Sequence, residues 1–173
     1  MRQPGGVNNA GLSRTVRTAG PADLVALLRV YAQRDQGGVL PSAASEVEQQ
    51  TWARMMATAN LTVYLAEVDG NTVGTATLLI MSNLTYRCAP TALIEAVVVA
   101  FAYRRQGIAT SIMRRILEDT RAAGCNKIQL LSHKRHATDG AHRLYTALGF
   151  EAEAEGFRLY QREVPDAVQA ART

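Results

Sequence analysis

The fold is decided by the stretch IEAVVVAFAYRRQGIATSIM, which occupies residues 94–113. It begins with an apolar run that contains a single acid, Glu95, and it continues into a basic turn that contains Gly107. Apolar residues then recur at the spacing of one helix face, at Ile108, Ile112, Met113, Ile116 and Leu117. The stretch therefore predicts a buried strand, a tight turn and an amphipathic helix.

The start of this helix is expected to attract anions. Its first backbone N–H groups lack acceptors within the helix, and the helix dipole is positive at this end. The small residues Gly107 and Ala109 would let a phosphate group lie against the backbone. Taken alone, the same residues also fit an ordinary strand-to-helix connection with a surface arginine pair.

Length and composition indicate one globular domain. A chain of 173 residues can bury a proper core, and 47% hydrophobic and 20% charged residues are ordinary proportions. No apolar stretch is long enough to span a membrane, and residues 1–13 are polar without a signal core. The two cysteines, Cys88 and Cys125, form neither a disulfide framework nor a metal-type pair. We therefore expect a cytoplasmic protein, although the sequence leaves a bond between these cysteines open.

Positive charge is concentrated in one part of the chain. The net charge is +4, and residues 104–143 hold nine Arg or Lys against three acids, which gives +6 there. Such a concentration favours a defined anionic partner, for which nucleic acid and a multiply phosphorylated cofactor are the two candidates. Arg114, Arg115 and Arg121 fall opposite the apolar stripe and also fit a solvated helix face.

The periodicity predicts alternating strands and helices along the chain. In chain order we expect strand 15–18, helices over 24–31 and 45–59, strands 61–68, 72–81 and 91–99, helix 108–123, strand 127–132, helix 141–148 and strand 157–162. The fold class is thus α/β (α+β mixed), a mixed sheet with helices on its faces. Residues 14–163 would form the single domain, between a flexible tail at 1–13 and a loose tail at 164–173.

Two residues are candidates for chemistry. Glu95 is a lone carboxylate in an otherwise apolar run, which fits either a general base or a strand-end acid paired with an arginine. Tyr145 lies on the apolar side of the last helix, where it is either a core tyrosine or a proton donor. His133 and His136 supply too few ligands for a metal site. Walker A, GxGxxG and Gly-x-Ser-x-Gly motifs are all absent from the sequence.

The motifs together resemble those of a known family. Arg104-x-x-Gly107-x-Ala109 after a strand, followed by Leu144-Tyr145-x-x-Leu148-Gly149-Phe150-Glu151, is similar to the GNAT superfamily of acetyl-CoA-dependent N-acetyltransferases. The likeness covers residues 61–160, and the first sixty residues match only in their β-α-α order. The family's central sheet is mixed and mostly antiparallel, with helices on both faces, and proteins of this fold often dimerise.

The resemblance implies a binding mode for the cofactor, acetyl-CoA, with no metal. The turn would hold the diphosphate, and the pantetheine arm would pair with the open edge of strand 91–99. The cofactor-binding residues implied are Val97, Val98, Val99, Arg104, Arg105, Gln106, Gly107, Ile108, Ala109, Thr110, Thr138 and Tyr145. Many members have Asn where this chain has Thr138, which departs from the family pattern.

The resemblance also implies a reaction in which an amine attacks the thioester directly. Glu95, directly or through a water, is the candidate base, and Tyr145 would protonate the departing thiolate. We expect an amine-bearing small molecule as acceptor, and the acids at Glu46, Glu48, Glu67 and 151–155 would favour a cationic one. A protein acetyltransferase and a CoA-binding module without turnover are the alternatives. A nucleic-acid partner is not expected, because few aromatics interleave with the basic residues. A membrane partner is not expected either, because no apolar stretch reaches the length of a membrane span.

Overall fold

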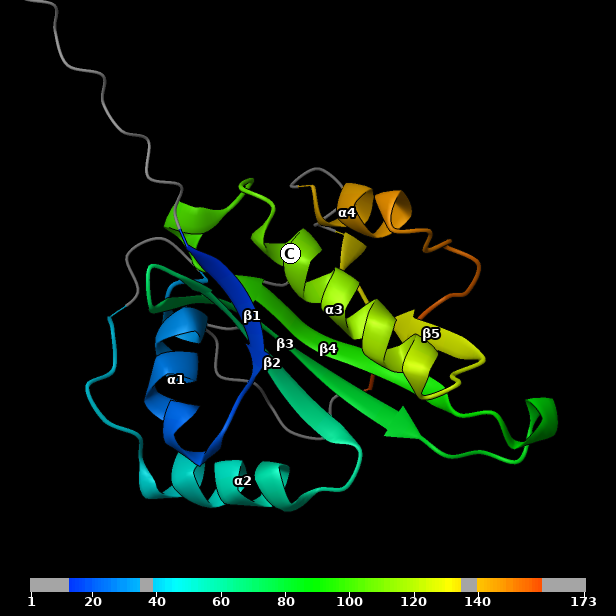
Figure 1. The fold of residues 1–173 in the computed structure, drawn as a ribbon, viewed down its shortest axis with the longest axis horizontal. Helices are drawn as coiled ribbons and strands as arrows, with labels where there is room; N and C mark the ends of the chain where they lie inside the picture. Colours follow the sequence, from blue (N-terminus) through cyan, green and yellow to red (C-terminus); the bar gives the residue numbers. More distant parts are fainter. Residues whose placement is uncertain (1–12, 35–38, 135–139, 160–173) are drawn as a thin grey trace, which may run out of the picture.

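The computed structural model describes residues 13–34, 39–134 and 140–159 (Figure 1). Within these residues, five strands form one sheet in the order β1-β2-β3-β4-β5, antiparallel throughout except for the parallel pair β4 and β5. The strands are β1 Arg14–Thr18, β2 Leu61–Val68, β3 Asn71–Met81, β4 Thr91–Val99 and β5 Lys127–Leu130. The helices are α1 Leu24–Ala32, α2 Glu46–Ala57, α3 Ile108–Ala122 and α4 Ala141–Ala147, with short 3-10 turns η1 Pro21–Asp23, η2 Tyr86–Cys88 and η3 Phe101–Tyr103.

Helices cover both faces of the sheet, α1 and α2 on one and α3 and α4 on the other (Figure 1). In β2, Val63 and Leu65 pack with α1 and α2, whereas Tyr64 and Ala66 pack with α3. Successive side chains of a strand point to opposite faces, so a strand in the middle layer is buried on both. This arrangement explains why residues 63–66 are all buried.

The helix α3 packs closely on the sheet because β3 carries a glycine at the contact. A Cβ atom on Gly74 would lie 2.9 Å from Ile108 Cγ2 and 3.1 Å from Ile112 Cδ1, which is too close for an unstrained contact. Ile112, Met113 and Ile116 are completely buried. The helix predicted from the apolar spacing is confirmed, and Gly124 follows it at φ 68° as the left-handed residue expected there.

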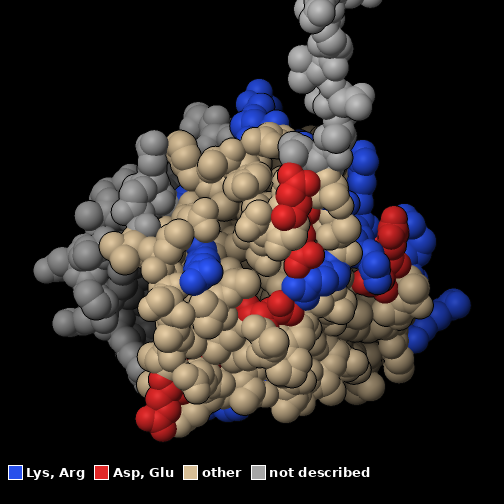
Figure 2. Space-filling model, turned by 60° about the vertical axis from the view of Figure 1, so that its left-hand side comes forward, with Lys and Arg blue, Asp and Glu red and all other residues tan. Residues whose placement is uncertain are grey.

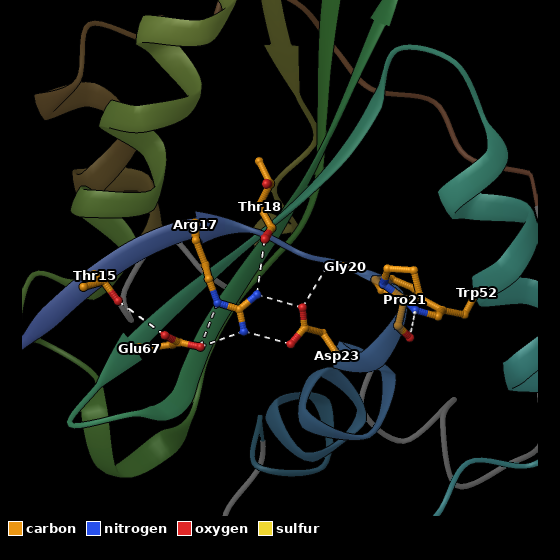
Figure 3. Close-up of polar contacts among 8 residues, drawn as sticks. All are labelled: Thr15, Arg17, Thr18, Gly20, Pro21, Asp23, Trp52 and Glu67. Atoms are coloured by element: carbon orange, nitrogen blue, oxygen red, sulfur yellow. Dashed lines mark hydrogen bonds and ion pairs between the residues drawn. The ribbon is translucent and has the colours of Figure 1, made fainter.

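An ion network attaches β1 to the helical part of the chain (Figure 3). The Arg17 guanidinium donates to both oxygens of Asp23, at 2.7 and 2.8 Å, and lies 2.7 Å from Glu67 of β2. The Asp23 carboxylate also accepts the Gly20 N–H at 2.7 Å. The hydrogen bond from Arg17 holds the pKa of Asp23 below its ordinary value, and the two carboxylates raise the pKa of Arg17. The network places η1, and with it α1, against the β1–β2 edge.

Most predicted elements are confirmed, including the hairpin at Asp69 and Gly70, whose φ values of 49° and 76° are those of a type I′ turn. Two boundaries and one predicted strand differ from the structure. Helix α2 ends at Ala57 instead of residue 59. Strand β5 ends at Leu130 instead of residue 132. The strand expected at 157–162 is not formed in its described part, where Phe157 and Leu159 are extensively exposed, and the rest of that segment lies outside the described residues. Without a buried face, apolar alternation does not by itself produce a strand.

Candidate active site

The start of α3 offers a run of unused backbone donors. The first helical hydrogen bond runs from the Ser111 N–H to the Gly107 carbonyl at 3.0 Å. The backbone N–H groups of residues 105–110 donate a hydrogen bond to no acceptor among the described residues. Gly107 is at φ 81° and Arg105 at φ 62°, and the first turn of α3 contains no acid. Such a helix start is an anion-binding geometry.

Arg104 is hydrogen bonded within the protein, unlike the open N–H groups of the residues that follow it. Its N–H donates to the Phe101 carbonyl at 3.2 Å, so the open run begins only at Arg105. Its guanidinium donates to the Val99 carbonyl at 3.3 Å and to the Arg34 carbonyl, and it lies 5.3 Å from the Phe101 ring centroid. The Arg104 side chain therefore connects the turn to β4 and to the end of α1.

Sequence reasoning missed one contact that positions the turn. Arg14, at the start of β1, donates from Nη1 to the Gln106 carbonyl at 2.9 Å. The two residues are 92 positions apart, and neither a motif nor a periodicity relates them. The bond connects the first strand to the turn before α3.

Strand β4 has an open edge beside this turn. Its first half pairs with β5 from Thr91 to Ile94, and β5 ends there at Leu130. Residues 95–99 pair on their other side with β3, and the register shifts at a bulge where Ala96 has φ 52°. In the described part of the chain no strand pairs with residues 95–99 on the β5 side. Unpaired strand groups need a partner, and an extended amide-bearing ligand could supply it.

Glu95 is exposed, and the structure corrects the expectation that it sits in a buried apolar run. It pairs across the sheet with Thr77, on the face that carries α1 and α2. Thr77 in turn hydrogen bonds with the Tyr31 hydroxyl of α1, whose pKa is raised by burial. Glu95 lies just before the bulge, where its carboxylate is open to solvent.

Tyr145 lies on the other face of the sheet. It packs with Val97 and Val99 against the apolar cluster under α3 and α4, and its ring meets Phe150 edge-on at 6.0 Å between centroids. Glu95 and Tyr145 are therefore on opposite faces of β4, on the two sides of its open edge. Thr138, the other predicted contact, lies outside the described residues.

Three of the six acids expected to favour a cationic acceptor have partners of neutral or opposite charge within the protein. The acids in question are Glu46, Glu48, Glu67, Glu151, Glu153 and Glu155. Glu48 forms a capping box with Ser45, Glu46 accepts from Gln50 at 3.0 Å, and Glu67 belongs to the Arg17 network. Acidic and basic side chains are interspersed on the side of the molecule shown in Figure 2, and much of that face is uncharged. No uniformly acidic surface is visible there.

The structure also bears on metal ligands, on the two cysteines and on membrane-spanning helices. Within the described ranges no group of three or more His, Cys, Asp or Glu side chains could hold a metal ion. Cys88 and Cys125 are both free thiols, and burial raises the pKa of Cys125. None of the helices in the described part of the chain is long and apolar enough to cross a bilayer.

Open amides at a helix start, next to an open strand edge, form a geometry that suits an extended phosphorylated ligand. The model of the acetyltransferase (GNAT) family matches residues 26–150. The chain is 29% identical over 125 residues to the aminoglycoside N(6')-acetyltransferase type 1 of Serratia marcescens, covering 70% of this chain and 84% of that protein.

Solved structures agree with the family match. A protein described as an acetyltransferase from Agrobacterium tumefaciens str. C58 superposes with a TM-score of 0.76 at 34% identity, over 85% of this chain and 99% of that one. The aminoglycoside N-acetyltransferase AAC(6')-Iy in complex with CoA shares the fold, with a TM-score of 0.70 at 18% identity, over 91% of this chain and 100% of its own. This chain belongs to the GNAT family of acetyltransferases and is an acetyl-CoA-dependent N-acetyltransferase.

Proposed function

We propose that the protein transfers the acetyl group of acetyl-CoA to a primary amine of a small molecule, by direct attack within a ternary complex. The observation that carries this proposal is the juxtaposition of open N–H groups at residues 105–110 with the open edge of residues 95–99. The acceptor class is supported by the Serratia marcescens relative, an aminoglycoside acetyltransferase.

The open donors fit the phosphates of coenzyme A. N–H groups of residues 105–110 would hold the diphosphate at the positive end of α3, where Gly107 has no Cβ to keep it away. Val97, Val98 and Val99 would pair with the amides of the pantetheine arm, as an added strand would. Thr138 stays a proposed contact.

Glu95 and Tyr145, on opposite faces of β4, would each carry out one proton transfer. Acetyl-CoA supplies the acetyl group as a thioester whose sulfur is the leaving atom. An alkylamine with a pKa near 10.4 is almost wholly protonated at neutral pH, so Glu95 or a water that it holds takes a proton from it. Among the backbone N–H groups of Val97–Val99, one that the pantetheine arm leaves unpaired would donate to the carbonyl oxygen, where negative charge develops. As the tetrahedral intermediate collapses and its C–S bond breaks, the Tyr145 hydroxyl gives a proton to the sulfur. The attacking nitrogen loses its second proton to solvent, Tyr145 regains a proton from solvent and Glu95 releases its own, so that one proton in all is released.

The test is a thiol-release assay with acetyl-CoA and a panel of small amines, amino acids and peptides. We expect Tyr145→Phe to lower kcat by about a hundredfold, the lower end of the contribution of a general acid, and to keep the affinity for CoA. Glu95→Gln should lower kcat by a smaller factor. The difference in kcat from the native protein should shrink as pH rises, because more of the amine is then already deprotonated without a base.

Matched controls are Tyr86→Phe, at an exposed tyrosine of η2, and Glu118→Gln, at an exposed acid of α3. Both should keep native turnover. Native rates in Tyr145→Phe and Glu95→Gln would remove both role assignments. CoA binding without thiol release from any amine would indicate a binding module, and release with peptides alone would indicate a protein acetyltransferase.

A further inference from the structure

Two arginines from different elements converge beside the α3 turn. A Cβ atom built on Gly140 would lie 2.1 Å from Arg105 Nη1 and 3.8 Å from Arg143 Nη2. The two guanidinium groups are therefore within roughly 6 Å of each other, a distance at which like charges repel. Arg105 comes from the turn before α3, and Arg143 comes from α4.

Gly140 makes this approach feasible. It has φ 100°, a conformation that side-chain-bearing residues rarely adopt, and any side chain there would occupy the position of the Arg105 guanidinium. Arg105 itself has φ 62°, which is unusual for a residue other than glycine. Local backbone geometry at both positions thus brings the two positive groups together.

Neither guanidinium is neutralised by the described part of the protein. The ion pairs found there involve Arg17 and Arg115, and no hydrogen bond or ion pair joins Arg105 or Arg143 to a described residue. Both arginines are exposed and open to a ligand. An anion between them would relieve the repulsion and could accept charge-assisted hydrogen bonds from both.

We propose that Arg105 and Arg143 clamp the ribose 3′-phosphate of coenzyme A. This inference rests on the proposed function, in which the open amides of residues 105–110 hold the diphosphate. Coenzyme A carries a second, separate anion, a phosphate monoester with close to two negative charges at neutral pH, which suits two guanidinium groups. Arg105 belongs both to the amide run and to the arginine pair, so the two phosphate sites are contiguous, as one nucleotide requires.

The test compares CoA with 3′-dephospho-CoA by isothermal titration calorimetry at one salt concentration. The native protein should bind CoA more tightly. Arg143→Ala should weaken CoA binding about tenfold or more, the loss expected for a charge-assisted contact, and should change 3′-dephospho-CoA binding less than about twofold. In steady-state assays, the KM for acetyl-CoA should rise and kcat should stay native.

The matched control is Arg121→Ala, which removes the same charge at the far end of α3, about 20 Å from its start. It should leave both affinities native. Equal losses for the two ligands in Arg143→Ala, or no loss for either, would overturn the 3′-phosphate assignment. If the native protein binds both ligands equally well, this inference alone fails, whereas binding of neither ligand refutes the proposed function as well.

Discussion

Replacing Gly107 by alanine tests whether the start of α3 holds a phosphate against its backbone. Gly107 has φ 81°, and a Cβ atom there would meet no protein atom within 4 Å. The substitution therefore costs the folded protein only backbone strain, about 1–2 kcal/mol for a non-glycine residue in the left-handed region. For a domain of this size that corresponds to a fall in Tm of about 2–8 °C.

The same helix provides a matched control at its other end. Gly124 has φ 68°, and a Cβ atom there would also meet nothing within 4 Å. Gly124→Ala should therefore lower Tm by a similar amount. Only Gly107→Ala should weaken the binding of CoA. Its methyl group enters the space that we assign to the diphosphate and disrupts contacts with the N–H groups of residues 105–110.

The expected loss follows from the contacts at risk. One hydrogen bond from a backbone N–H to a charged phosphate contributes about 1.5–3 kcal/mol, so Kd for CoA should rise roughly tenfold to a hundredfold. Calorimetric titration of both variants, with differential scanning calorimetry of the apo proteins, provides the measurements. If both variants lose similar stability and Gly107→Ala binds CoA with native affinity, close approach of the ligand to this turn is refuted.

Three further predictions concern stability and are checked by urea unfolding. Arg17 lowers the pKa of Asp23 below 3.8, so the ion pair stabilises the fold above that pH, and this stabilisation is lost as pH falls through the lowered pKa. Asp23→Asn should lower the free energy of unfolding by about 1 kcal/mol at neutral pH, a small value because the Arg17 side chain is 40% exposed. The variant should also lack the part of the acid-induced loss of stability that Asp23 causes. Tyr64→Phe should cost about 1–2 kcal/mol, because the buried hydroxyl donates to Asp119 at 2.7 Å; native stability would show that this bond contributes nothing net. Gly74→Ala should cost about 1–3 kcal/mol by forcing α3 away from β3, and an unchanged midpoint would contradict that packing.

Features set by neighbouring residues could be predicted from the sequence. The I′ turn at Asp69 and Gly70 depends on two backbone conformations that these residue types tolerate, and it appears as expected. The apolar spacing from Ile108 to Ile116 likewise predicts which face of α3 is buried. The amide run before Ser111 follows from the geometry of any helix start.

Features that need two distant segments were not predictable in the same way. The exposure of Glu95 depends on the bulge at Ala96 and on the residue at which β5 ends. Neither feature can be predicted from the hydropathy pattern along the chain. The convergence of Arg105 with Arg143 requires α4 to pack beside the turn, with a glycine at the point of contact.

The sequence by itself determined the order of most elements, the turn chemistry and the family, because propensity, periodicity and backbone conformation act over a few neighbouring residues. Only the tertiary structure decided which edge of β4 stays open, on which faces Glu95 and Tyr145 lie, and which arginines are free to bind a ligand. The physical reason is that register, burial and the pairing of charges depend on segments that meet only when the sheet is assembled and its helices pack.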